Sequence, residues 1–170
     1  QTALSATKTP TLLVLTRQNL PTLPQTDQLA AQGVKRGGYV LSPAQGEIPE
    51  GILIATGSEV QLAMAAQDQL RDAGHDVSVV SLPSFELFDA QSAEYRESVL
   101  PSCVTRRVAI EMGTSFGWEH YVGLQGKIIG INNRYGASGN PDAIISQFGF
   151  TTDNVTATYL KTFSEAAEKA

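Results

Sequence analysis

Short apolar runs alternate along most of the chain with segments long enough for helices, and this alternation constrains the fold more than any other feature. The runs predict strands at 39–41, 52–55, 77–82, 107–110 and 127–131. Helices are predicted at about 59–73, at about 90–99, from Asn140 onward and at about 151–168. Strands separated by helices of this length are typical of a mostly parallel or mixed sheet with helices on both faces. We therefore predict a three-layer α/β/α fold with about five strands.

The beginning of the chain does not fit this pattern. Residues 11–15, Thr-Leu-Leu-Val-Leu, form a continuous apolar run that is typical of a buried strand in a parallel sheet. Such a strand needs neighbours on both sides, but only a few residues precede it. Leu20-Pro21-Thr22-Leu23-Pro24 then predicts an extended connection, and Gly37-Gly38 a turn. We interpret residues 1–36 as the end of a preceding domain with a linker, and residues 37–170 as a domain.

Charge and composition exclude several classes of protein. The 170 residues carry a net charge of −5, which argues against a general nucleic-acid binder. No run of about 18 apolar residues is present, so no membrane span is expected. The first ten residues lack the basic and apolar regions of a signal peptide. Cys103 is the only cysteine, which excludes an internal disulfide and favours a reducing, cytoplasmic setting.

Arg17 is the best candidate for a functional residue. It follows the apolar run 11–15, and ligands of open α/β sheets bind at the carboxyl ends of the strands. A guanidinium group offers a planar fork of donors that matches a phosphate and keeps its charge at any working pH. Position alone favours a structural role, in which the arginine caps the sheet edge or pairs with a nearby carboxylate.

Gly57-Ser58 is the second candidate, as an anion site. The pair follows a predicted strand and precedes a predicted helix, where free backbone N–H groups and the helix dipole favour negative charge. A tight turn with a serine N-cap explains the same residues.

Other polar residues are interpreted as structural. Glu111 ends a strand near the sheet edge, and we expect an N-cap or a salt bridge because a single carboxylate makes no acid–base pair. His120 is expected in a hydrogen-bonded or interface role, and His75 in an exposed turn. The segment 136–139, Gly-Ala-Ser-Gly, lacks the length and the lysine of a phosphate loop, so we expect close backbone packing or a subunit contact.

Six short motifs in order resemble the transketolase family, from the end of its pyrimidine-binding domain to its C-terminus. The motifs begin at Thr16 and end at Thr151, so the resemblance covers nearly the whole chain. They are Thr16-Arg17-Gln18-Asn19-Leu20-Pro21, Gly38-Tyr39-Val40-Leu41, Ile54-Ala55-Thr56-Gly57-Ser58-Glu59-Val60, Tyr95-Arg96-Glu97-Ser98-Val99-Leu100-Pro101, Tyr135-Gly136-Ala137-Ser138-Gly139 and Phe148-Gly149-Phe150-Thr151. Tyr135 stands where the family often has Phe.

The resemblance implies a thiamine-diphosphate enzyme that transfers two-carbon ketol units between ketose and aldose phosphates in the pentose phosphate pathway. It implies a divalent metal (Mg²⁺ or Ca²⁺), a homodimer, and an antiparallel edge strand, for which we nominate residues 39–41. It also implies that Arg17 contacts the substrate phosphate. The family's Gly-Asp-Gly cofactor motif, its catalytic glutamate and its active-site histidines have no counterpart here, so we expect no catalytic residue, cofactor or metal in this chain.

Two other interpretations stay open. One is the equivalent domain of 1-deoxyxylulose-5-phosphate synthase or of a 2-oxoacid dehydrogenase β-chain. The other is a stand-alone binding or dimerisation module without enzyme function.

Overall fold

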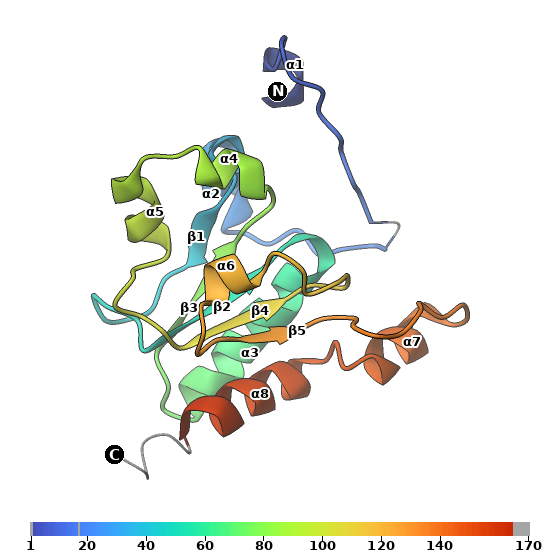
Figure 1. Cartoon of the computed structure of the whole chain (residues 1–170). Helices are drawn as coiled ribbons and strands as arrows, with labels where there is room; N and C mark the ends of the chain where they lie inside the picture. The colour runs from blue at the N-terminus through green and yellow to red at the C-terminus, as the bar shows by residue number, and fades with distance from the viewer. Residues whose placement is uncertain (1, 17, 165–170) are drawn as a thin grey trace.

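The computed structural model of the chain describes residues 2–16 and 18–164 (Figure 1). In this part of the chain, five strands form one sheet in the order β1-β3-β2-β4-β5. The strands are β1 (Tyr39–Ser42), β2 (Gly51–Ala55), β3 (Val77–Ser81), β4 (Arg107–Ile110) and β5 (Lys127–Ile129). β1 pairs antiparallel with β3, and all other pairs are parallel. The predicted sheet, with its antiparallel edge strand at 39–41, is confirmed.

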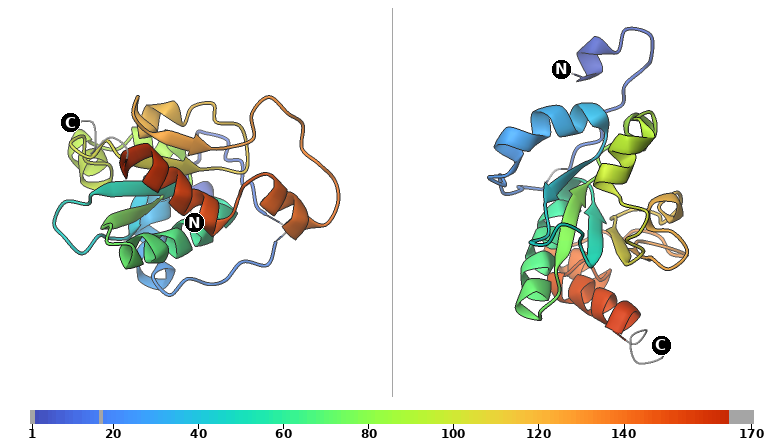
Figure 2. Two further views of the ribbon diagram at one scale, coloured as in Figure 1. Left: turned by 90° about the horizontal axis from the view of Figure 1, so that it is seen from below. Right: turned by 90° about the vertical axis from the view of Figure 1, so that its left-hand side faces the viewer.

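Helices cover both faces of the sheet. On one face lie α3 (Val60–Asp72) and α8 (Thr152–Ser164), side by side in both views of Figure 2. On the other face lie α4 (Phe85–Asp89), α5 (Ala93–Val99) and α6 (Glu119–Val122). The remaining elements are α1 (Thr2–Ser5), α2 (Thr26–Gly33), α7 (Pro141–Gln147) and the 3₁₀ turns η1 (Val34–Arg36) and η2 (Gly57–Glu59).

The alternation of side chains along β2 explains the three layers. Leu53 and Ala55 point into the core beneath α3 and α8, whereas Ile52 and Ile54 point into the core beneath α4, α5 and α6. All four side chains are fully buried. A strand that is apolar on both faces needs a cover on each, which is why this sequence folds as a sandwich of helices around a sheet.

The helix predicted at 90–99 is observed as the shorter α5 at 93–99, and α4 at 85–89 was not predicted. Ser84 caps α4 by accepting from the N–H of Leu87 at 3.3 Å, and Ser92 caps α5 by accepting from the N–H of Tyr95 at 3.3 Å. Each serine cap fixes the beginning of one of these two short helices. The helix predicted from Asn140 onward is confirmed as α7, and the Asn140 side chain caps it by accepting from two backbone N–H groups.

Residues 11–15 follow an elongated path but join no strand of the described part of the chain (Figure 1). The side chains of Leu12, Val14 and Leu15 are each more than 80% exposed. Within residues 2–16 and 18–164 the run thus has no partner strand, and its apolar side chains are left uncovered.

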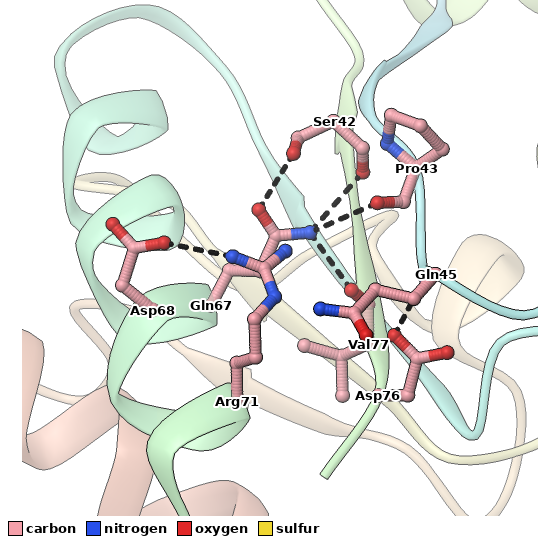
Figure 3. A network of polar contacts seen from close by, with 8 residues as sticks. All are labelled: Ser42, Pro43, Gln45, Gln67, Asp68, Arg71, Asp76 and Val77. Carbon is pink, nitrogen blue, oxygen red and sulfur yellow. Dashed lines mark hydrogen bonds and ion pairs between the residues drawn. The ribbon is translucent and has the colours of Figure 1, made fainter.

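A buried glutamine fixes the edge of the sheet. Gln67 of α3 is 1% exposed, and its side chain lies between β1 and β3 (Figure 3). Its Nε2 donates to the carbonyl of Val77 at 2.8 Å, and its Oε1 accepts from the Ser42 hydroxyl at 2.7 Å. Nε2 also lies 3.3 Å from the Ser42 carbonyl and 3.5 Å from that of Pro43. The register shift of β1 at Ser42 is thus held by a side chain from a helix.

We expect Gln67→Leu to lower the free energy of unfolding by about 2 kcal/mol, because it leaves buried acceptors without a donor. Gln69→Leu is the matched control on the same helix. Gln69 is exposed and its contacts to α8 are at the surface, so a change within about 0.5 kcal/mol is expected. Urea denaturation of both variants measures the difference. Equal losses in the two variants would contradict the assigned role of Gln67.

Candidate functional site

The connections of β2 create a crevice at the carboxyl edge of the sheet. After β2 the chain passes through α3 to β3 on one side, and later through α4 and α5 to β4 on the other side of β2. The neighbours β2 and β4 therefore connect to opposite sides of the sheet: β2 leads to β3, and β4 leads to β5. In open α/β sheets, ligands bind at such a topological switch point.

The turn after β2 lies at this point. Gly57 has φ +54°, a left-handed conformation that favours glycine. The Ser58 hydroxyl donates to the Glu59 carboxylate, which also accepts from the backbone N–H groups of Glu59 and Met112. Glu59 is 4% exposed, and burial raises the pKa of its carboxyl group. The anion site predicted at Gly57 and Ser58 thus already faces an internal carboxylate; binding of an external anion there stays a prediction.

Glu111, at the end of β4, brings a second carboxyl group to the same place. Burial and, to a smaller extent, the nearby charge of Glu59 together raise its pKa from 4.5 to about 7. The N-cap or salt bridge predicted for Glu111 is wrong: within the described residues it joins no ion pair and begins no helix. β4 pairs with β2, and this pairing sets the two carboxyl groups beside each other.

We expect this pair to make stability depend on pH. A carboxyl group whose pKa is raised on folding favours the folded state at low pH, and that contribution is lost as pH rises through the folded pKa. For Glu111 the loss should fall between pH 4.5 and about 7. Glu111→Gln should flatten this part of the stability curve and raise the melting temperature at pH 8. The exposed Glu47→Gln is the control, and its curve should follow the parent; a Glu111→Gln curve parallel to the parent would refute the assignment.

A crevice of about 480 Å³ opens beside the carboxyl pair. The turn after β2 and the end of β4 form one wall, and the N-terminal segment forms the other through Leu12, Val14 and Leu15. Arg17, predicted to hold a substrate phosphate, lies outside the described residues. Its sequence neighbours Thr16 and Gln18 line the crevice, and the role of Arg17 stays a prediction.

The histidines lie away from this crevice. The Nε2 of His120 is 3.8 Å from an Asp89 oxygen, and its side chain is largely exposed. His75, predicted in an exposed turn, is partly buried, and its Nδ1 lies 3.0 Å from Glu50. Glu50 also accepts from Arg106 at 2.7 Å. This cluster at the amino edge was not predicted from the sequence, because Glu50 and Arg106 are 56 residues apart.

The segment 136–139 is exposed in the loop between β5 and α7. Its predicted role in backbone packing or a subunit contact is not tested by the chain alone.

No group of three or more His, Cys, Asp or Glu side chains in residues 2–16 and 18–164 is arranged to hold a metal ion. No helix in the described residues is long and apolar enough to cross a membrane.

The sheet order, the helices on both faces and the crevice at the switch point define a doubly wound α/β domain. The family described as "Transketolase-like TK C-terminal domain" matches residues 37–151. The transketolase of Geobacillus stearothermophilus is 55% identical over 153 residues, which are 90% of this chain and 23% of that protein. The transketolase of Bacillus subtilis is 52% identical over 90% of the chain and 23% of that protein.

Solved structures of transketolases support the same family assignment. A Pichia stipitis transketolase in complex with sedoheptulose-7-phosphate has a TM-score of 0.85 at 38% identity, over 98% of this chain and 24% of that chain. Leishmania mexicana transketolase has a TM-score of 0.71 at 35% identity, over 79% of this chain and 19% of that chain. The chain belongs to the transketolase family and corresponds to its C-terminal domain. It spans less than a quarter of the length of these relatives.

Proposed function

We propose that the chain is the C-terminal part of a cytoplasmic, homodimeric, thiamine-diphosphate-dependent transketolase that moves two-carbon units from ketose to aldose phosphates. The observation that carries this proposal is similarity over nearly the whole chain to enzymes of that name. Thiamine diphosphate and its divalent metal would bind in domains that precede this chain. The domain itself would be catalytically silent and would support the upstream domains by packing against them.

The distribution of exposed apolar side chains supports such packing. Residues 12–15 are exposed, as is Phe116 in the loop after β4, at 86%, and Tyr135 in the loop after β5, at 97%. In Figure 1 the N-terminal segment and the loop leading to α7 project on the same side of the sheet. Apolar surface of this extent indicates a protein interface. We propose that the preceding domain of the same enzyme covers it.

Two measurements test the proposal. Calorimetric titration of the 170-residue chain with thiamine diphosphate and Mg²⁺ should give no binding heat. Mixing the chain with the polypeptide encoded upstream in the same gene should restore ketol transfer from a ketose phosphate to an aldose phosphate. Tight cofactor binding to the chain alone, or an upstream polypeptide that does not respond to the chain, would overturn it.

A further inference from the structure

A second cavity lies on the face of the sheet that α4, α5 and α6 cover, away from the crevice at the switch point. Its volume is about 240 Å³, and it opens where α4, α5 and α6 meet the beginning of β4. Its charged lining residues are Asp89, Arg96, Glu97, Arg107 and His120.

Arg107 brings a positive charge that no carboxylate pairs with among the described residues. Its guanidinium group donates to the backbone carbonyls of Leu100, Pro101, Val104 and Tyr121 at 2.6–3.1 Å. These carbonyls fix the group in place but carry no net charge. Burial lowers the pKa of Arg107, which indicates that the cation is poorly solvated.

Arg96 brings a second positive charge with unused donors. Its Nε is buried and meets no acceptor in the described part of the chain, and the residue joins no ion pair there. A buried donor without an acceptor is costly, and a partly desolvated guanidinium group is stabilised by a negatively charged partner.

The two acids of the cavity are already bonded. Glu97 accepts from the backbone N–H of Ser102 at 2.7 Å and from its hydroxyl at 2.8 Å. Asp89 accepts from the Tyr121 hydroxyl at 3.1 Å and lies 3.8 Å from His120. The cavity therefore combines two arginines that form no ion pair within 4.0 Å among the described residues with two carboxylates that already accept hydrogen bonds from Ser102 and Tyr121. The charge of Glu97 also acts on Arg107 from a longer distance.

We propose that this cavity binds a small oxyanion, with Arg96 as its main ligand and Arg107 as a fixed positive charge beside it. A guanidinium fork matches the oxygens of a phosphate, a sulfate or a carboxylate. The volume is below the roughly 300 Å³ at which pockets for larger ligands begin, so a nucleotide is excluded and a small ion fits. The inference does not depend on the proposed function.

Inorganic phosphate is the first probe. It is titrated into the ¹⁵N-labelled chain at constant ionic strength with chloride as the balancing ion. Amides of α5, of residues 104–107 and of α6 should shift and saturate, with a Kd on the order of millimolar. Acetate is the second probe. Saturable shifts with acetate but not with phosphate would still support an oxyanion site and would assign it to carboxylates.

Arg96→Gln should weaken binding by at least about tenfold. Arg96→Lys keeps the charge but loses the fork, should weaken binding by a smaller factor, and serves if the glutamine variant fails to fold. Arg71→Gln is the matched control: the Nε of Arg71 is also buried without an acceptor, but Arg71 pairs with Asp68 at 3.0 Å. Flat shifts with both anions, or equal losses in the Arg71 and Arg96 variants, would overturn the proposal.

Discussion

Replacing Gly51 with valine should destabilise the domain by about 3 kcal/mol or more, a large part of the total stability of a domain of this size. Gly51 begins the central strand β2 and is fully enclosed. A Cβ atom there would lie 2.8 Å from the carbonyl oxygen of Arg106 and would overlap the Tyr159 side chain. Neither neighbour has room to move, because Arg106 precedes β4 and Tyr159 is fully buried in α8.

Gly136→Val is the matched control for this substitution. No atom lies within 4 Å of a Cβ built at Gly136, which is in an exposed loop. Its free energy of unfolding should stay within about 0.5 kcal/mol of the parent. Guanidinium denaturation followed by circular dichroism compares the two variants, and a Gly51→Val protein as stable as the parent would show that β2 can shift.

The strands were predictable because burial on both faces leaves a strong pattern in the sequence. Residues 52–55 and 107–110 are nearly continuous apolar runs, and both are strands in the structure. The face of α3 was predicted less well. The spacing of Leu62, Ala66, Leu70 and Ala73 predicts one buried face, but of these only Ala66 and Leu70 are buried. The buried positions beside them are Ala63 and the polar Gln67. A hydrophobic pattern does not reveal a glutamine that is buried to bond the backbone of an edge strand.

The candidate site was only half predictable. The sequence placed Gly57, Ser58 and Glu111 after strands, and the structure finds them at the same edge of the sheet. The pairing of Glu59 with Glu111 was missed, because it depends on β2 and β4 being neighbours. In chain order β3 lies between them, so the sequence alone did not bring the two carboxyl groups together. The sequence signal for this pair was Glu59, which directly follows the turn at the end of β2.

The second large effect concerns the N-terminal segment and depends on the proposed function. Leu13 and Leu15 are 70% and 82% exposed, and no strand of the described residues pairs with them. If the preceding domain covers them, each leucine contributes about 1.5–3 kcal/mol to the association. Together they amount to roughly a hundredfold or more in the dissociation constant between this chain and the upstream polypeptide.

Leu13→Lys combined with Leu15→Lys should therefore weaken that association by at least about a hundredfold, while the fold of residues 37–164 stays intact. Ile48→Lys combined with Leu124→Lys is the control, since these side chains are 66% and 107% exposed but precede β2 and β5 at the opposite edge of the sheet. Surface plasmon resonance measures both affinities. Equal affinities for the parent and the Leu13/Leu15 variant would show that the upstream domain docks elsewhere, whereas a loss in both variants would indicate a general effect of added charge. A loss confined to the Leu13/Leu15 variant is the result expected if the apolar segment completes a sheet that the rest of the enzyme provides.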